Sequence, residues 1–477
     1  MARNKVYFLI SLLNTMVGCS GEQTEVSNEI EIPVWQAESG LPNSPLDSDL
    51  LSIQGQIIGE GVLEKHGMPH MLDGLLIVPT PQDFQFYDVS DPTNPTEQFR
   101  IPHVMPIEHF SLAFSNAWSE RSLISSGISG AAIFDVSNLS EATVLVDITV
   151  EGGGFGEYIN RAENIGVQAP WLFVPTSENG IVVVDATDPT DPREVAHISP
   201  EDVGFENTGY AWAVGNRLFT SCHSCAGAAV IDISNPEDPV VLDSTNAVET
   251  FGYGLTLKRD AMWIATKGES GAQGIQKLTI TSEGSIEISD KFEVGMGGSA
   301  DGGYIAFQDD IFHFGASKEG YRKVDAASLS ALDGFELTDI PDAEDLDFAM
   351  GFGPLLAIGD DDASTTTLMF HSTQEDTTGP IVEMVNPIEG ASGLPSTSRV
   401  GIVLSDWIDA RSLHPATFQL RDAEGNLIEG FLSTQSGIVN FTPHNYLQSS
   451  EYTLLIKGLR DHAGNEMIPF ESHFSVE

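Results

Sequence analysis

The sequence predicts an all-β protein in which one strand-and-turn unit is repeated through most of the chain. Ten residues at 86–95, FYDVSDPTNP, return in altered form as IFDVSNLSEA at 133–142, VVDATDPTDP at 183–192 and VIDISNPEDP at 230–239. Each copy is an apolar run with the character of a strand, which ends in Asp and is followed by a turn rich in Ser, Thr, Asn and Pro. Because these are turn-forming residues, we assign the repeated aspartates to turns and not to catalysis.

The spacing of the repeat predicts how many units there are. The Asp that ends each apolar run falls at 88, 135, 185 and 232, and further steps of this size lead to apolar segments near 279, 326 and 373. A second apolar run precedes each of these positions, and these runs are LLIVP, SLISS, WLFVP, RLFTS, AMWIA, DIFHF and PLLAI. A strand unit repeated every 40 to 50 residues is typical of a β-propeller.

No long amphipathic helix interrupts the repeat. We therefore predict a seven-bladed β-propeller over residues 50–373, with counts of six and eight left open because terminal repeats are often atypical. The segment LLSIQGQIIG at 50–59 is expected to supply the outer strand of the last blade and so to close the ring.

The phrasing of the repeat resembles one known family. The pairs LIVP with FYDVSDPTNP, and LFVP with VVVDATDPTDP, are similar to the LVIVD-repeat propellers of bacterial secreted and surface proteins. The first four units carry the resemblance, whereas the last three keep the spacing and lose the Asp-Pro turns. The resemblance implies a fold, and it brings no single activity with it.

A second module follows the linker EDTTGP at 375–380. Its short apolar segments, separated by Gly, Pro and Asp-containing turns, predict an Ig-like β-sandwich over residues 380–477. The stretches GLP at 393–395 and LRDHAGN at 459–465 resemble a bacterial Ig-like domain of the S-layer type, which implies a spacer or an adhesive module.

Two residues of that module have the chemistry of calcium ligands. Asp461 and Asn465 carry oxygen donors four residues apart. Asp, Gly and Asn are also the usual residues of a tight turn, and we favour a closing turn here over a calcium site.

The first nineteen residues, MARNKVYFLISLLNTMVGC, have the three parts of a secretory signal: basic Arg3 and Lys5, an apolar run at 6–13 and a small-residue end. The run is too short to span a bilayer. Its end, MVGC, resembles the bacterial lipobox, with Met16 where Leu is usual. The resemblance implies cleavage before Cys19 and attachment of lipid to Cys19.

A plain secreted protein with an unmodified Cys19 stays an alternative. Residues 20–48 contain no Lys or Arg and three prolines, and we interpret them as a flexible tether. The expected location is the bacterial envelope, at the outer membrane or the cell surface.

The charge of the chain argues against some partners. There are 70 Asp and Glu residues against 21 Lys and Arg, which gives a net charge of −49. Such a chain is repelled by nucleic acid phosphates and by anionic membrane surfaces, so membrane contact is left to the lipid anchor. The expected partner is a protein or a glycan.

Cys222 and Cys225 form the motif CHSC, which falls in a hairpin turn of the repeat. A redox-active pair needs a lowered thiol pKa, usually at a helix N-terminus, and no helix is predicted here. Exported proteins enter an oxidising compartment, so we expect a structural disulfide, with redox and metal roles as alternatives.

The mouth of the central channel is the expected place for a binding site. We expect the innermost strands to begin there, and polar residues recur at that position of the repeat. They could hold calcium or a transition metal, or they could line a solvated funnel with no ligand. These candidates are His66, Glu108, His109, Glu163, Asn164, Glu206, Asn207, Glu344 and Asp345.

We assign His66 and His70 to a loop, because Gly67 and Pro69 forbid a helix that would bring them together. The sequence contains no serine-hydrolase elbow, phosphate loop or HExxH zinc motif. We therefore predict a non-catalytic, lipid-anchored surface protein that binds a partner, and no cofactor is assigned. The alternatives are a propeller enzyme of the metal-dependent hydrolase or lactonase type, with its site in the channel, and a purely structural scaffold.

Overall fold

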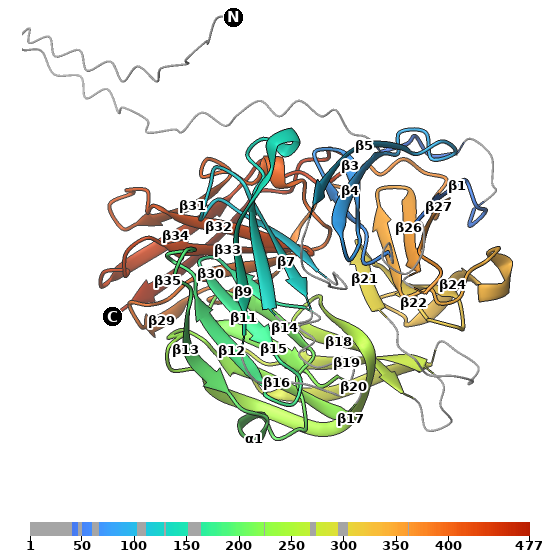
Figure 1. Ribbon diagram of the computed structural model, residues 1–477. Coiled ribbons are helices and arrows are strands. Elements are labelled where there is room, and N and C mark those ends of the chain that lie inside the picture. Colours follow the sequence, from blue (N-terminus) through green and yellow to red (C-terminus); the bar gives the residue numbers. More distant parts are fainter. Residues whose placement is uncertain are drawn as a thin grey trace, which may run out of the picture.

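The computed structural model describes most of the chain, and the described residues are 41–45, 50–59, 66–102, 111–127, 130–150, 164–223, 225–267, 273–293, 304–360 and 362–477. Strands dominate them, as Figure 1 shows. The short helix α1 (Pro200–Val203) and single 3₁₀ turns at Leu139–Glu141, Leu337–Asp339 and Ala410–Ser412 are minor elements. Among the described residues, no helix has the length and apolar character needed to cross a membrane.

The strands before residue 371 form antiparallel meanders of four, and counted over the described residues seven such groups can be separated. Groups 4 and 5 share the long strand β17, which pairs first with β16 and then with β18. Group 1 is β2 (His70–Leu72), β3 (Leu75–Pro79), β4 (Asp83–Asp88) and β5 (Thr96–Pro102), group 2 is β6 (Leu112–Ser115), β7 (Ser122–Gly127), β8 (Gly130–Asp135) and β9 (Thr143–Thr149), and group 3 is β10 (Gly166–Gln168), β11 (Trp171–Pro175), β12 (Ile181–Asp185) and β13 (Arg193–Ile198). Group 4 is β14 (Tyr210–Val214), β15 (Arg217–Ser221), β16 (Ala226–Asp232) and β17 (Val240–Leu257), and group 5 is β17 with β18 (Ala261–Lys267), β19 (Gln273–Ile280) and β20 (Ile286–Glu293). Group 6 is β21 (Tyr304–Gln308), β22 (Ile311–Gly315), β23 (Tyr321–Asp325) and β24 (Ser330–Phe335), and group 7 is β25 (Phe348–Phe352), β26 (Leu355–Asp360), β27 (Thr365–Phe370) and β1 (Gly55–Ile58).

The first strand of each group faces the middle of the ring, where β10 contacts β14 and β21 contacts β25. The ring closes through β1, which pairs with β27 so that Gly55 lies opposite Leu368. This confirms that the segment 50–59 supplies the outer strand of the last group. The C-terminal part of the expected tether is also in contact with the fold, because Leu41 packs against the main hydrophobic core.

The repeated aspartates form turns, as the sequence predicts. In each of the first four groups the Asp at the end of the third strand accepts a hydrogen bond from the backbone N–H two residues later, a local bond that fixes the turn. The pairs are Asp88 with Ser90 (2.9 Å), Asp135 with Ser137 (2.9 Å), Asp185 with Thr187 (2.9 Å) and Asp232 with Ser234 (2.7 Å).

The C-terminal module is a sandwich of two four-stranded sheets with its own apolar core. One sheet runs β28–β30–β33–β32 and the other β29–β35–β34–β31, in which β29 and β35 are parallel. The strands are β28 (Val382–Asn386), β29 (Ala391–Leu394), β30 (Val400–Leu404), β31 (Phe418–Asp422), β32 (Gly430–Gln435), β33 (Ile438–Pro443), β34 (Ser450–Ile456) and β35 (Phe470–Val476).

The sandwich and the ring form one body. Strand β32 pairs with β6, the first strand of group 2, so one sheet of the sandwich continues into the ring. Among the described residues, each group of the ring contributes a contact near its first hairpin turn. These contacts are Asp73–Arg411, Asn116–Leu432, Gln168–Asn440, Asn216–Asn386, Lys258–Glu383, Asp309–Ser405 and Phe352–His462.

We predict that Asn440→Ala lowers the stability of the whole chain and not of the sandwich alone. Asn440 is 2% exposed and its amide bonds backbone groups of the ring. Leaving buried partners unpaired costs about 1–3 kcal/mol each. Thermal unfolding followed by circular dichroism and calorimetry measures the change, with Asn445→Ala on the exposed surface as the control. Equal melting temperatures for both variants would contradict the contact.

Candidate functional site

The hairpin between β32 and β33 reaches the middle of the ring. Gln435, at the end of β32, donates from Nε2 to the Ile165 carbonyl at 2.8 Å and to Asn164 Oδ1 at 3.1 Å, and its Oε1 accepts from the Val167 N–H at 3.2 Å. The same Nε2 bonds Ser111 Oγ at 2.8 Å. One amide side chain therefore joins the starts of two innermost strands.

Asn440 makes a matching connection farther along β33. Its Oδ1 accepts from the Gly215 N–H at 2.9 Å, and its Nδ2 donates to the Ala213 carbonyl at 2.8 Å and to the Val167 carbonyl at 3.3 Å. These backbone groups belong to the inner edge of the ring, where a buried polar group needs a partner. The sandwich supplies the partner through its side chain.

Apolar contacts seal the other side of the hairpin. The Trp407 ring lies 5.6 Å from that of His70 and 5.8 Å from that of Phe352. A Cβ at Gly437, whose φ is +78°, would lie 3.6 Å from Cζ of Phe307. Phe307 and Phe352 come from the first strands of groups 6 and 7, so the hairpin tip contacts the side of the ring opposite β6 and β10.

The predicted channel residues that the structure describes do not converge on one site, and they make separate contacts with their own neighbours. His66 is fully buried, and its Nδ1 lies 2.9 Å from Thr366 Oγ1. Asn164 is 1% exposed and bonds Gln435 and the Ala211 carbonyl. Asn207 is 5% exposed, and its Oδ1 accepts from the His223 N–H at 2.8 Å.

The other predicted channel residues differ in exposure. Glu206 and Glu344 are exposed, whereas Asp345 is buried and its backbone N–H donates to Asp360 Oδ2 at 3.2 Å. Glu108, His109 and Glu163 lie outside the described residues, as does Cys19. Within the described part of the chain, no group of side chains placed to share a metal ion includes any of the candidates.

His70 occupies a place that the sequence did not indicate. It begins strand β2, is 3% exposed, and its Nε2 accepts from the Leu112 N–H at 3.3 Å. Burial lowers the pKa of His70 to about 3, so the imidazole is neutral. The loop assignment was wrong for His70, because Pro69 precedes a strand at this point.

Cys222 and Cys225 are joined by a disulfide bond, with their Cα atoms 5.5 Å apart. The bond lies between β15 and β16, and Cys222 is 1% exposed. The disulfide thus pins one hairpin of group 4, and Asn207 holds the adjacent backbone at His223.

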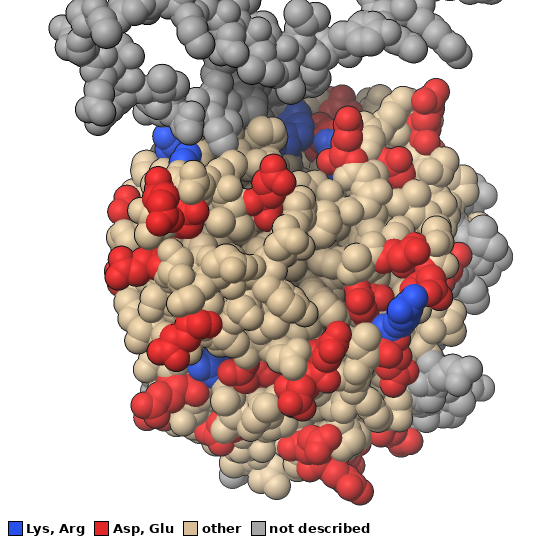
Figure 2. All heavy atoms as spheres, turned by 90° about the vertical axis from the view of Figure 1, so that its left-hand side faces the viewer, with Lys and Arg blue, Asp and Glu red and all other residues tan. Residues whose placement is uncertain are grey.

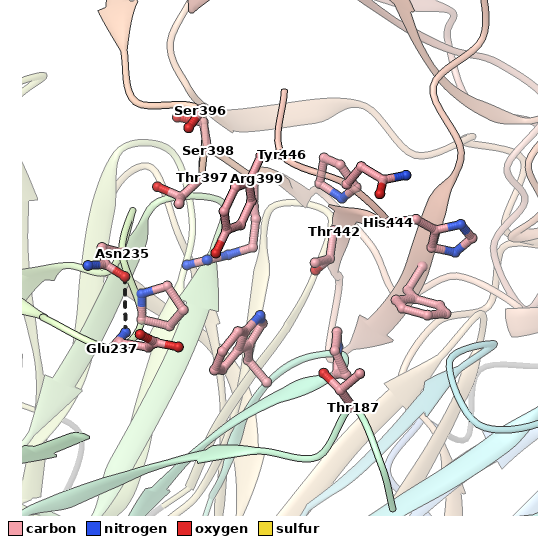
Figure 3. A pocket seen from close by; sticks show the side chains of 16 residues that line it. Thr187, Asn235, Glu237, Ser396, Thr397, Ser398, Arg399, Thr442, His444 and Tyr446 are labelled. Atoms are coloured by element: carbon pink, nitrogen blue, oxygen red, sulfur yellow. Dashed lines mark hydrogen bonds between the residues drawn. The ribbon is translucent and has the colours of Figure 1, made fainter. Parts of the chain in front are cut away.

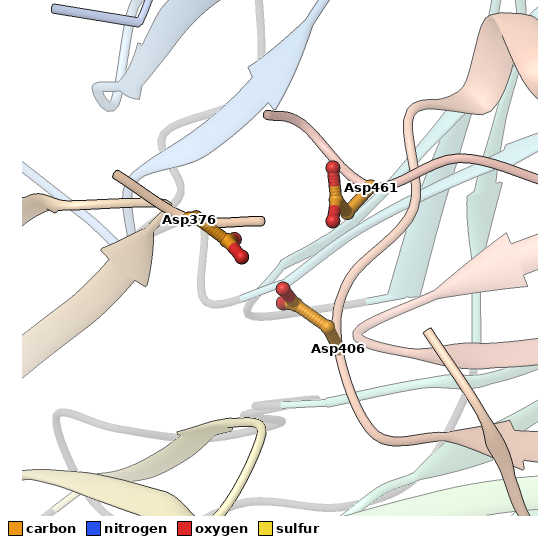
Figure 4. A group of neighbouring side chains, drawn as sticks. All are labelled: Asp376, Asp406 and Asp461. Atoms are coloured by element: carbon orange, nitrogen blue, oxygen red, sulfur yellow. The ribbon is translucent and has the colours of Figure 1, made fainter. Parts of the chain in front are cut away.

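A cluster of carboxylates lies where the linker, the sandwich and the ring meet. Asp376, Asp406 and Asp461 each offer an oxygen, and these atoms lie within 4.8 Å of one another. Figure 4 shows the three side chains pointing toward one another. Asp406 is 4% exposed and Asp461 is 1% exposed. Asp461 also forms the predicted turn, since its Oδ1 accepts from the Asn465 N–H at 2.8 Å.

Burial and mutual repulsion favour the protonated form of this cluster. Burial raises the pKa of Asp461 to about 7, and the neighbouring Asp376 adds to the effect while bonds from Asn465 oppose it. Burial, with Asp461 next, raises the pKa of Asp406 well above its ordinary value. Carboxylate oxygens at this spacing could instead hold a hard divalent cation such as calcium. Of these three residues the sequence pattern indicated only Asp461 as a possible calcium ligand, because Asp376 and Asp406 are distant from it in the chain.

We predict that the free energy of unfolding falls as the pH rises from about 6.5 to 8. Below that range buried His70 and His462, whose pKa burial lowers to about 3 and about 4, act in the opposite direction, because the unfolded chain takes up protons there that the folded one does not. A carboxyl group whose pKa is raised in the folded state holds its proton there after the unfolded chain has lost it, so stability is greatest below the unfolded pKa and is lost through the folded one. Asp406→Asn removes one charge, and it should flatten this dependence and raise the melting temperature at pH 8 by about 2 °C or more.

The measurement is thermal unfolding in a chelating buffer over that pH range, with the exposed Asp238→Asn variant as the control. An unchanged pH dependence in the Asp406→Asn variant would show that the cluster does not carry the effect. Added calcium tests the cation, which would keep the carboxylates ionised and oppose the loss of stability at high pH.

Comparison with known proteins agrees with this architecture. Residues 376–476 match the family of bacterial Ig-like domains, and residues 160–198 match the LVIVD repeat. No curated protein matches the chain. The expected combination of an LVIVD-repeat propeller with a C-terminal Ig-like domain is thereby confirmed.

Two solved structures are similar to about two thirds of this chain. One is the β-propeller domain of Cps50 (Swd1) from Myceliophteria thermophila, with 11% identity, a TM-score of 0.51, and coverage of 67% of this chain and 99% of that one. The other is the computationally designed Ika8 protein, with 10% identity, a TM-score of 0.44, and coverage of 66% and 98%. At this identity the first likeness shows the propeller fold alone.

Proposed function

We propose that this chain is an exported, lipid-anchored surface protein that binds a partner and catalyses no reaction. The observation that carries the proposal is the hairpin in the middle of the propeller. An enzyme with its site in the channel needs a cavity there with convergent reactive groups. Gln435 and Asn440 reach into that space, and their amides are used on the backbone of the ring.

The surface fits a role in binding outside the cell. Figure 2 shows acidic side chains spread over one face of the molecule and basic ones at few places, in keeping with the net charge of −49. Such a surface favours solubility and disfavours polyanionic partners. The bacterial Ig-like family match over residues 376–476 also supports a place in the envelope.

The anchor is the lipidated Cys19 that the sequence indicates, followed by the residues up to 40 as a tether. Several acyl chains would hold the protein stably, because one chain alone binds a membrane only marginally. The propeller and the Ig-like domain would then stand off the membrane as one rigid unit, since they share a sheet through β6 and β32.

We predict that the chain, expressed in a diderm bacterium, is labelled by an alkyne-tagged palmitate and is found in the membrane fraction. Cys19→Ala should abolish the label and release the protein in soluble form. That soluble form should bind isolated bacterial envelopes saturably and should hydrolyse none of the ester, lactone and phosphoester substrates of a standard panel.

Label on the Cys19→Ala variant would refute the anchor. The absence of saturable envelope binding would refute the binding role, and a metal-dependent turnover that follows the purified protein would favour the alternative of a channel enzyme.

A further inference from the structure

A pocket of about 210 Å³ lies between the Ig-like domain and groups 3 and 4 of the propeller. Figure 3 shows its lining, with Thr187 and Asn235 from the turns of the ring on one side and residues 396–399 and 442–446 of the sandwich on the other. At about 30 Å³ per water molecule it holds roughly seven waters, which is the size of one sugar ring. Pockets at domain junctions are common places for ligands.

Aromatic rings form part of its wall. Tyr446 is 72% exposed, and among the large hydrophobic side chains exposed in the described part of the chain it is the one aromatic. Trp171 is half-buried on the side of the ring, and Phe431 meets His444 edge to face, with ring centroids 4.4 Å apart. An exposed tyrosine presents a flat apolar face with a polar tip, which suits a ligand with both kinds of surface.

Polar groups line the interior. Thr442 is 7% exposed, lines the pocket, and its hydroxyl has no hydrogen-bond partner among the described residues. A buried hydroxyl without a partner is unfavourable, and a ligand that bonds it removes that cost. Figure 3 places Thr442 between Arg399 and His444, inside the pocket.

Arg399 is the second polar side chain of the lining with hydrogen-bonding capacity left for a ligand. Arg399 is 2% exposed, and its guanidinium bonds two uncharged oxygens, Gln168 Oε1 and the Ile233 carbonyl. No described carboxylate forms an ion pair with it, and burial lowers its pKa to about 9. Five N–H donors are available on a guanidinium, so the group has donors left for a ligand oxygen.

The charge of the lining selects the class of ligand. Its charged side chains are Arg399 and Glu237, which have opposite signs, and the remaining polar groups are hydroxyls, amides and one imidazole. A chain with a net charge of −49 repels polyanions at long range. A neutral ligand with several hydroxyl groups and an apolar ring face is therefore matched by this pocket.

We propose that this pocket binds one ring of a neutral carbohydrate, with its apolar face against Tyr446 and its hydroxyls bonded to Thr442 and Arg399. This inference rests on the proposed binding function and names the partner class and the place. A peptide is the competing class of ligand, and the test below includes peptides.

The test uses the full chain with Cys19→Ala, applied to an array of neutral oligosaccharides of glucose, galactose, mannose and N-acetylglucosamine, with uronate glycans and peptides alongside. We expect at least one neutral glycan to bind. Tyr446→Ala should weaken this binding tenfold or more and Thr442→Val about threefold or more, and neither variant removes a hydrogen bond within the pocket wall. Ile468→Ala, at a residue that is 64% exposed and outside the pocket, is the matched control.

The proposal is overturned if no neutral glycan binds, if uronate glycans or peptides bind instead, or if Tyr446→Ala binds as the unsubstituted pocket does. Binding to bacterial envelopes is measured with the same proteins. Envelope binding that persists in Tyr446→Ala would leave the proposed function standing and refute this pocket, whereas loss of envelope binding in every form would refute the function itself.

Discussion

The architecture depends on one interaction, the entry of the β32–β33 hairpin into the middle of the propeller. A ring of strands leaves backbone groups and side chains of its innermost strands facing a channel, and buried polar groups need partners. Here the amides of Gln435 and Asn440 bond those groups, while Trp407 fills the apolar part. The Ig-like domain is therefore part of the core of the propeller and not a separate module on a linker.

The same arrangement determines where chemistry can occur. The hairpin occupies the middle of the ring. The close group of like-charged side chains lies instead at the junction of the two domains, where Asp376, Asp406 and Asp461 face one another. The space between the domains becomes the pocket that Arg399 and Tyr446 line. The pocket needs the two domains together, so a change that loosens the hairpin should affect it.

Local patterns in the sequence predict local structure well. The repeat gives the strands and the Asp turns, because a turn such as that at Asp185 depends on residues two apart. The segment 50–59 could be assigned to the last group because ring closure requires a strand there. The contact of Asn440 with Gly215 joins residues far apart in the chain, and Asn440 stands in an ordinary strand pattern, so nothing local identifies it. For the same reason the sequence pattern places Asp376 in a linker and does not indicate the carboxylate cluster.

The most direct test of the hairpin is hydrogen exchange at two backbone amides of the ring. Val167 and Gly215 donate to side chains of the Ig-like domain, namely Gln435 and Asn440. The account predicts that both amides are protected in the intact chain, and that Asn440→Ala speeds exchange at Gly215 while the strands of group 1 keep their protection. If the Gly215 amide of the intact chain exchanged as fast as an amide in an exposed turn, the result would contradict this account of the hairpin.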